Sequence, residues 1–503
     1  MRLAIFLMLF IVCMAVQRST AQQPSPSVPV RDDNTQAWIN KHAIEVRSID
    51  PVDEDFGDLE PLMDAIGKAR VVQLGEPSHG AGSALSAKVR LIKFLHRRMG
   101  FDVLAWESGL YDVRLAQAAL GTAEDVAKAA RRGILPVWSN AKEVMPLFEY
   151  ARISQGTTRP LDMVGFDMSI TAPGTEEQFA ADLRSFAATL RESARRRNAT
   201  MFVERILSAY GRLHAHRIVR QRKQGEASKA GLSGKALDDA MTAWEKVEGV
   251  RERPAKADFD DFVGAINGLL TEISGNRTVF EEVHSDREVG FMVRALENMR
   301  GRGSSVYDSE RTDPPSAEVQ TTNGWNRRDT LMAGNLRWLI EEAYPGRKVI
   351  VWAHNAHIMN AHFGPDFKGV YLKPQPNGMT PTGVSLADWL KDIVYSVAMT
   401  TYDGEEMWTN FQRKGAISPA PQGSLESRLH MLGKSLIFLD LRPARRGGKD
   451  HPMRTQQSMR ISGFGPPTGP YGNDLVPDLT TAFDAVFYID RMLPATPICF
   501  GPC

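Results

Sequence analysis

The sequence predicts an α/β fold: a mainly parallel, doubly wound sheet with an inserted helical subdomain. Two observations support this class. Short apolar runs alternate with amphipathic helical runs in residues 56–174 and again in 326–490, an alternation typical of a parallel sheet. Residues 175–300, between these two halves, are charged and mostly follow a helical period. The chain has 503 residues, 43% of them hydrophobic, which permits one large core or two domains.

The first 21 residues have the pattern of a secretory signal peptide. One Arg is followed by an apolar run and by small residues that end at Ala21, where we expect cleavage. The apolar run is too short for a comfortable membrane span, and no later stretch is long and apolar enough for one. We therefore expect an exported protein, either secreted or periplasmic. Residues 22–55 follow as a linker and an N-terminal helix over 34–46.

The first half of the α/β domain begins with a helix over 59–66, which leads into a short buried strand. An amphipathic helix follows this strand and stops at Gly100. The predicted strands are residues 71–74, 102–106, 161–166, 348–353, 393–399, 435–441 and 485–489. Helical segments at 111–131, 141–154 and 327–344 lie between them.

The insertion is expected to be helical over residues 175–300, with segments at 176–195, 200–223, 234–250 and 258–272. His214 and His216 stand among basic residues there and are expected to be solvated. His96 and His284 have the spacing of surface helix positions. Residues 301–325 are polar and contain two prolines, which predicts a mobile loop. We expect the insertion to form the helical side of a pocket, and the loop to act as its lid.

The chain carries almost no net charge. Lys plus Arg number 61 against 60 Asp plus Glu, and loss of Arg2 and Arg18 with the signal peptide leaves 59 basic residues and a formal charge of −1. No nucleic-acid partner is expected of a neutral chain, and the oligomeric state stays open. In the tail, 491–503, Cys499 and Cys503 are spaced for a disulfide in an oxidising compartment. Because this tail follows the last predicted strand, we expect loss of the bridge to have little effect on activity.

Residues 71–80, VVQLGEPSHG, carry the main chemical signal. The strand ends at Gly75, Glu76 and His79 stand in the loop, and a helix begins soon after. In an open α/β sheet, loops at the carboxyl ends of strands bind ligands. The helix N-terminus is also expected to offer free N–H groups and a positive dipole end to a negative charge. A capped turn with an incidental histidine is the alternative.

Other strands end on similar groups. Glu107 follows the second predicted strand, Asp167 the third, and His354 and His357, in WAHNAHI, the fourth. Because the carboxyl ends of parallel strands share one edge of a sheet, we expect these groups to converge, with Glu107 beside His79 one strand over. Each carboxylate alone is equally compatible with capping the next helix, which is the favoured role for Asp167.

Several familiar arrangements are absent. The sequence has no GxSxG elbow, no Walker loop and no HExxH, and residues 80–85 begin like GxGxxG but end in Leu. Imidazole and carboxylate groups suit zinc or manganese, so a divalent metal would take its ligands from Glu76, His79, Glu107, His354 and His357. The same five groups are equally suited to general acid–base chemistry without a metal.

Four motifs in this order resemble the erythromycin esterase family: LGEPSHG, AWES, GFD and WAHNAHI. PVWSNAKEV at 136–144 and RRDTLMAGNLRWL at 327–339 support the resemblance, which extends over residues 59–490. Characterised members of that family hydrolyse the macrolactone ester of erythromycin-like macrolides, which gives antibiotic resistance. The resemblance therefore implies a hydrolase acting on ester bonds, with a small-molecule ester as its substrate.

The resemblance also implies roles for individual residues. His79 corresponds to the general base, Glu76 and Glu107 to essential acids, and His354 and His357 to the paired histidines. Arg328 or Arg327 corresponds to the arginine upstream of that pair. Lys88 stands where the family often has an arginine. Catalytic roles are thus expected for His79, Glu76, Glu107, His354, His357 and Arg328, and substrate-binding roles for Lys88, Asp167 and Arg327.

The expected mechanism is direct attack of water on an ester carbonyl, with no cofactor required. His79 takes the proton while Glu76 or Glu107 holds its tautomer. His354, His357 and an arginine stabilise the oxyanion and the leaving alkoxide. Hydrolysis should therefore fall as the pH drops and His79 takes up a proton.

Three alternatives remain open at this point. Ser78 is a further candidate nucleophile in the first motif. The same acids and histidines would also serve a metal-dependent hydrolase of a different ester, amide or glycan-linked substrate. The third alternative is a non-enzymatic extracytoplasmic binding protein on the same fold, against which the retained acid and histidine set argues.

Overall fold

The computed structural model describes residues 33–121, 125–172, 174–190, 192–367, 369–407, 413–461, 463 and 474–498. The predicted signal peptide and the pair Cys499 and Cys503 lie outside these residues. The chain divides into two compact units, the first formed by Met1–Pro173 with Met332–Cys503 and the second by Gly174–Leu331. None of the described helices combines the length and the apolar character that a membrane crossing requires.

The first unit is built on a nine-stranded mixed sheet, counted over the described residues, in which most strands are parallel. Its strands are β1 (Ile44–Glu45), β2 (Val71–Leu74), β3 (Phe101–Gly109), β4 (Asp162–Asp167), β5 (Lys348–Trp352), β8 (Val394–Met407), β9 (Lys414–Ile417), β10 (Leu436–Asp440) and β13 (Ala485–Met492). Their order is β1-β10-β13-β8-β2-β5-β3-β4, and β9 pairs with β8. Strands β13, β8, β2, β5, β3 and β4 are mutually parallel, whereas β1, β9 and β10 run antiparallel to their neighbours. The predicted α/β class is confirmed.

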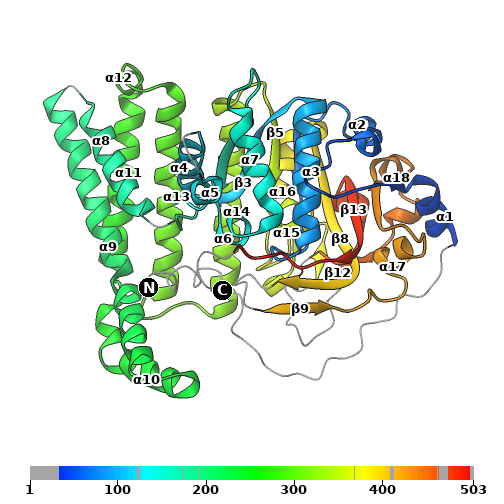
Figure 1. Ribbon diagram of the computed structural model, residues 1–503. Helices are drawn as coiled ribbons and strands as arrows, with labels where there is room; N and C mark the ends of the chain where they lie inside the picture. The colour runs from blue at the N-terminus through cyan, green and yellow to red at the C-terminus, as the bar shows by residue number, and fades with distance from the viewer. Residues whose placement is uncertain are drawn as a thin grey trace. The chain divides into compact units, whose positions relative to one another are not determined.

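Helices cover both faces of this sheet (Figure 1). Val72 and Leu74 of β2 pack into a core with α3 (Gly82–Met99) and α7 (Met145–Ser154). Gln73 alternates to the opposite face, where it lies near α15 (Asn355–Ile358) and α16 (Thr382–Leu390). The remaining helices of this unit are α1 (Asp33–His42), α2 (Pro61–Ile66), α4 (Leu110–Leu120), α5 (Val126–Ala130), α6 (Pro136–Ser139), α17 (Leu425–His430), α18 (Arg442–Arg446) and α19 (Leu479–Ala482). Two small sheets pair β6 (His362–Phe363) with β7 (Val370–Tyr371) and β11 (Gln457–Met459) with β12 (Asp474–Val476).

The N-terminal helix is shorter than predicted. Helix α1 ends at His42, and Ile44 and Glu45 form the edge strand β1, in which Ile44 is paired with Phe438 of β10. Ile44 packs against the main core, so tertiary pairing outweighs the helical pattern that the sequence suggests over 34–46.

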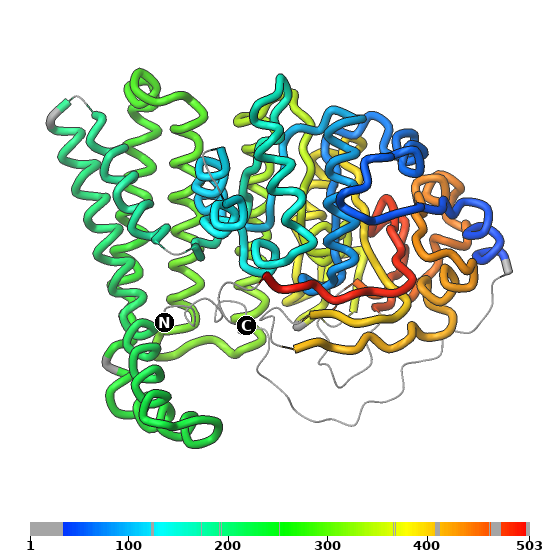
Figure 2. Tube along the Cα trace, in the orientation of Figure 1, coloured from blue at the N-terminus to red at the C-terminus, as the bar shows by residue number. Residues whose placement is uncertain are grey.

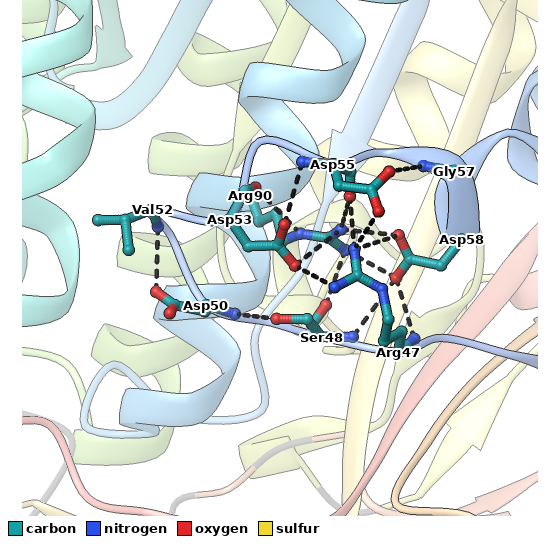
Figure 3. Close-up of polar contacts among 9 residues, drawn as sticks. All are labelled: Arg47, Ser48, Asp50, Val52, Asp53, Asp55, Gly57, Asp58 and Arg90. Atoms are coloured by element: carbon teal, nitrogen blue, oxygen red, sulfur yellow. Dashed lines mark hydrogen bonds and ion pairs between the residues drawn. The ribbon is translucent and has the colours of Figure 1, made fainter.

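A buried arginine of α3, Arg90, binds the loop of residues 47–58 that follows β1 (Figure 3). Arg90 is 1% exposed, and its Nη1 and Nη2 donate to both carboxylate oxygens of Asp58 at 2.9 and 2.7 Å. Nη1 also donates to the carbonyl oxygen of Ser48 at 2.8 Å, while Arg47 pairs with Asp53 at 2.9 Å. The two guanidinium groups therefore neutralise the acidic loop together, and removing Arg90 would take the bidentate partner from Asp58.

The second unit consists of long helices, drawn in green shades in Figure 2. They are α8 (Thr175–Ala188), α9 (Ser193–Lys229), α10 (Gly234–Val247), α11 (Lys256–Gly275), α12 (Arg277–Glu281), α13 (Asp286–Glu310) and the greater part of α14 (Ala317–Trp338). The prediction of a mobile loop over 301–325 is wrong. Helix α13 continues through buried Val306 and Tyr307, and only residues 311–316, which include the two prolines, separate it from α14.

The predictions for the histidines outside the motifs also need correction. His96, expected at the surface, is 5% exposed, and its ring nitrogens bond the Tyr150 hydroxyl at 2.5 Å and the Arg159 carbonyl oxygen at 3.0 Å. His214 and His216, expected to be solvated, are 7% and 2% exposed. Charged neighbours in the sequence suggest that these histidines are exposed. Packing of the long helices against one another buries them instead.

His216 links three helices of the second unit. Its Nδ1 bonds Glu310 at the end of α13, and its Nε2 lies 2.9 Å from Glu245 of α10, which also accepts from Arg253. Burial lowers the pKa of His216, but the hydrogen bonds to Glu310 and Glu245 outweigh that effect and raise it overall. The imidazolium is therefore the form that holds α9, α10 and α13 together.

Unfolding experiments at different pH values test this link. The stabilisation from a raised histidine pKa is complete below the ordinary value of 6.5 and is lost as the pH rises through the folded-state value. His216→Gln should therefore lower stability by about 1–3 kcal/mol at pH 6 and by less at pH 9, measured by urea unfolding. His430→Gln, at an exposed histidine paired with Asp490, is the control and should change little. An equal loss at both pH values would contradict the role of the imidazolium.

Candidate active site

The strand order brings the first and last sequence motifs together. β5 lies between β2 and β3, so the carboxyl ends that carry Glu76, His354 and Glu107 are neighbours. The predicted convergence is confirmed for these groups. Glu107, however, is two strands from His79 rather than one, and it lies inside β3, which continues to Gly109 after a register shift that begins at Trp106.

Glu76 is the centre of the first cluster and is fully buried. Its Oε1 lies 2.9 Å from Nδ1 of His79 and accepts a hydrogen bond from Nε1 of Trp138 at 3.1 Å. Its Oε2 forms an ion pair with Nζ of Lys88, which also donates to the carbonyl oxygen of Ala353 at 3.1 Å. Glu76 is therefore the carboxylate that orients His79 in this structure.

Lys88 is fully buried as well, and its Nζ lies 4.2 Å from the centroid of the Trp352 ring. Burial lowers the pKa of Lys88 to about 8, although the negative charges of Glu76 and Glu107 oppose this shift. At neutral pH the ammonium form prevails and compensates the charge of Glu76. This lysine was expected to bind substrate, and in the structure its ammonium group contacts Glu76 and the carbonyl oxygen of Ala353.

The second cluster joins Glu107 to the paired histidines. Oε2 of Glu107 accepts from the backbone N–H of His354 at 2.8 Å, and Oε1 lies 3.3 Å from Nε2 of His357. The rings of His79 and His354 meet edge to face at 5.4 Å between centroids, which connects the two clusters. All five acid and imidazole groups are at most 4% exposed. Interactions between charges are stronger in such a buried environment than in water.

Both ring nitrogens of His354 bond the backbone. Nε2 lies 3.0 Å from the carbonyl oxygen of Pro77, and Nδ1 accepts from the N–H of Ala356 at 3.1 Å. This pattern requires the proton on Nε2 and a neutral ring. Burial lowers the pKa of His354 well below its ordinary value, and the neighbouring His79 acts in the same direction. His354 thus holds the loop of Pro77 and caps α15.

Two glycines of the first motif allow the close approach of other segments. A Cβ atom at Gly75 would overlap the Asn355 side chain, and one at Gly80 would overlap the backbone of Met407. Asn355 in turn bonds Met399 in both directions, with its Nδ2 donating at 2.8 Å and its Oδ1 accepting at 3.1 Å. Gly75 thus makes room for the Asn355 side chain, and Gly80 for the backbone of β8.

Three of the N–H groups in the first turn of α3 and the turn before it are already bonded, so these are not free as expected. The N–H of Gly80 donates to Oγ of Ser78, that of Ala81 to the carbonyl oxygen of Ser78, and that of Ser83 to the carbonyl oxygen of Leu493. Ser78 Oγ therefore accepts a bond within its own turn. These three amides are therefore engaged within the protein and not directed at a ligand.

The C-terminal tail lies against the first motif, which the sequence did not predict. The N–H of Ala495 donates to the carbonyl oxygen of Gly80 at 2.9 Å, and that of Ile498 donates to the carbonyl oxygen of Asn140 at 2.8 Å. Figure 2 shows this segment in red, running from the end of β13 past the start of α3. The tail thus supports both the His79 loop and the segment that carries Trp138.

Three further predicted site residues lie on other elements, Asp167 on β4 and Arg327 and Arg328 on α14. Asp167, at the end of β4, is 2% exposed and accepts from the N–H of Ser169 at 3.3 Å within a turn. The next helix, α8, has Gly174 as its N-cap, so the helix-capping role expected for Asp167 is wrong. Arg327 and Arg328 belong to α14 within the second unit. Arg327 pairs there with Asp308 of α13 at 2.7 Å, whereas Arg328 is half-buried.

The five predicted metal ligands do not form a metal-binding arrangement. In the described part of the chain, no three or more His, Cys, Asp and Glu side chains are grouped to hold a metal ion. Glu76 is bonded to Lys88 and Trp138, and both nitrogens of His354 are bonded to backbone groups. A donor set already engaged in this way does not fit a divalent cation.

Trp138 is the residue that sequence reasoning missed. It is fully buried, it donates to Glu76, and its ring meets that of His79 edge to face at 5.2 Å between centroids. The stretch PVWSN that contains it supported the family resemblance, but its wide separation from Glu76 in the sequence hid the contact. Trp138 is a positioning residue, since it fixes the carboxylate that in turn fixes the imidazole.

Replacing Trp138 with phenylalanine removes this N–H and keeps an aromatic ring. We expect hydrolysis to fall by about 10- to 100-fold, because a hydrogen bond to a charged group contributes about 1.5–3 kcal/mol. Trp106→Phe is the matched control, since the indole N–H of Trp106 is buried without a hydrogen-bond partner. Steady-state rates across the pH range should differ from the wild type in profile for Trp138→Phe only. Equal losses in both variants would reduce Trp138 to a packing role.

Known proteins resemble this chain over most of its length. The erythromycin esterase family model matches residues 96–492. YbfO of Bacillus subtilis (strain 168), to which a hydrolase function has been provisionally assigned, is 26% identical over 439 residues, or 86% of each chain.

Solved structures show the same fold. A Bacillus cereus protein has a TM-score of 0.66 at 19% identity and covers 93% of this chain and 99% of its own. A histidine-to-asparagine variant of the erythromycin esterase EreC, in its open conformation, has a TM-score of 0.59 at 19% identity and covers 91% of this chain and 100% of its own.

Proposed function

The chain belongs to the erythromycin esterase family and is a hydrolase of ester bonds, and we propose that His79 is its general base in direct attack of water on a macrolactone-type ester. The observation that carries this proposal is the buried cluster of His79, Glu76, Trp138 and Lys88. A carboxylate held by two further donors is a fixed partner for the imidazole. Such an arrangement orients a base without a nucleophilic side chain.

The hydrogen bond between His79 and Glu76 sets the tautomer. With its proton on Nδ1, 2.9 Å from Oε1 of Glu76, the ring has its basic lone pair on Nε2. Nε2 then takes a proton from the attacking water, and the resulting imidazolium is stabilised by the carboxylate. The same imidazolium returns the proton to the leaving alkoxide, which completes hydrolysis with atoms and charge in balance.

We assign stabilisation of the oxyanion to His357 and Arg328. His357 is the member of the histidine pair whose Nε2 faces a carboxylate, that of Glu107 at 3.3 Å. In its protonated form, Nε2–H stays on Glu107 and Nδ1–H is the donor proposed for the oxyanion. Arg328 is proposed from the family resemblance as the cationic donor. Since His79 is only 2% exposed, the residues that cover it must move to admit a substrate.

A macrolactone is the proposed substrate class, and export is the proposed destination. The family and the carboxylates of the site support a substrate that carries a cationic group, such as the amino sugar of a macrolide. Export rests on the pattern of the first 21 residues.

A hydrolysis screen of the purified mature protein tests the function. Macrolides and simple esters are incubated with the protein, with and without a chelator, and the hydrolysed products are measured by mass spectrometry. We expect ring opening of a macrolactone at a rate that the chelator does not change. Loss of activity with the chelator and its return with zinc or manganese would replace the proposed mechanism with the metal-dependent alternative. Specific binding without turnover of any ester would favour a binding protein.

A further inference from the structure

A polar cavity lies on the sheet face opposite α3. It has a volume of about 390 Å³ and is lined by Gln73 of β2, by residues that follow α15, and by parts of α16, α18 and the start of β8. None of the acid and imidazole groups of the candidate active site contributes to its lining. A cavity of this size accommodates a small organic ligand.

The charged lining of this basic cavity consists of Lys391, Arg442, Arg445, Arg446, Asp392 and Asp484. Four cations face two carboxylates, so the lining has a net positive charge of two. Excess positive charge of this kind favours a dianion over a neutral or cationic ligand.

Asp484 fixes the geometry of two of the arginines. Its Oδ1 lies 3.0 Å from Nε of Arg442 and 3.0 Å from Nη2 of Arg445. The same guanidinium groups donate to backbone carbonyl oxygens, Arg442 to Val394 and Arg445 to Thr480, both at 2.6 Å. These two side chains are therefore held in place before any ligand arrives, which reduces the entropic cost of binding.

The two remaining cations are exposed. Lys391 follows α16 in a left-handed backbone conformation with φ of 48°, and Arg446 ends α18. Both line the cavity and are long enough to turn toward a bound anion. The arrangement thus combines two fixed guanidinium groups with two adaptable charges.

From this juxtaposition we propose that the basic cavity binds a small molecule through a phosphate group. A phosphate monoester has a charge of about −1.5 to −2 at pH 7, which matches the excess charge of the lining. Guanidinium forks match phosphate oxygens in geometry as well as in charge. Neutral polar side chains on the cavity wall, those of Gln73, Asn360 and Ser396, would face the organic part of the ligand.

Isothermal titration of the full chain tests this proposal, with inorganic phosphate, phenyl phosphate and benzoate as probes at constant ionic strength. We expect both phosphates to bind, and phenyl phosphate to bind about tenfold or more tightly than benzoate, because benzoate has a single charge. The double variant Lys391→Gln/Arg446→Gln should weaken phosphate binding by about tenfold or more. Both residues are exposed, so these substitutions leave the core intact.

Lys449→Gln is the matched control, because Lys449 is exposed and near α18 but does not line the cavity. It should bind phosphate like the wild type. Unchanged affinity in the double variant, or an equal loss in the control, would overturn the assignment of the site. Equal affinity for benzoate and phenyl phosphate would overturn the assignment to a phosphate group. Binding by this cavity is independent of esterase activity, so a failed hydrolysis screen would not affect it.

Discussion

Replacing His79 with alanine is expected to reduce ester hydrolysis by about 10²–10⁴-fold, the usual contribution of a positioned general base. The loss should appear in kcat, because His79 acts on the attacking water rather than on substrate binding. The His79 ring is held by Glu76 and packs edge to face against Trp138 and His354. Because these three residues keep other partners when the ring is removed, we expect the variant to fold. Steady-state kinetics on the ester identified by the screen provide the measurement.

The variant must also be shown to fold. Far-UV circular dichroism and thermal unfolding of His79→Ala should stay close to the wild type. His430→Ala, at an exposed histidine paired with Asp490, serves as the control for a general effect of losing an imidazole. Near wild-type turnover by a folded His79→Ala protein would refute the proposed base, and another residue of the first motif, such as Ser78, would then have to carry the reaction.

The fold was largely predictable because its signals are local. A buried parallel strand between a helix and a glycine-containing turn is visible within ten residues, and all seven predicted strands are present, from β2 to β13. Strands β1 and β9 were missed because they are short edge strands that antiparallel pairing defines, a contact between residues far apart in the sequence. The prediction of a loop over 301–325 was wrong because the polar residues on the exposed side of α13 conceal the apolar pattern of its buried side.

The sequence predicted which residues form the site, but it did not predict the contacts between them. Parallel strands ending in Glu76, Glu107 and His354 imply one shared edge, and the structure has it. The sequence could not say that β5 lies between the other two, so it could not choose the partner of His79. Trp138 and the tail at Ala495 contact the first motif through pairings that no sequence period encodes.

Lys88 explains why a buried carboxylate can remain charged beside the base. Glu76 is fully buried, and an uncompensated charge at such a position costs several kcal/mol. Lys88→Met should therefore destabilise the protein by about 3–5 kcal/mol in urea unfolding, because it leaves Glu76 without its cation. Lys93→Met on the same helix is the control, since Lys93 donates to the carbonyl oxygen of Pro51 and the variant leaves no carboxylate unpaired. Equal losses in the two variants would show that the ion pair has no special role.

The pH dependence of kcat in the Lys88→Arg variant tests the same ion pair. Burial lowers the pKa of Lys88 from 10.5 to about 8, so its unfavourable contribution to stability is complete below pH 8 and is relieved between these two values. Activity should respond in the opposite direction: as Lys88 loses its proton, the uncompensated Glu76 opposes the developing oxyanion, and kcat should fall with an apparent pKa near 8. Arginine stays protonated throughout this range, so Lys88→Arg should keep its rate up to about pH 10. A fall at the same pH in both proteins would assign the alkaline transition to another group and remove Lys88 from the electrostatics of the site.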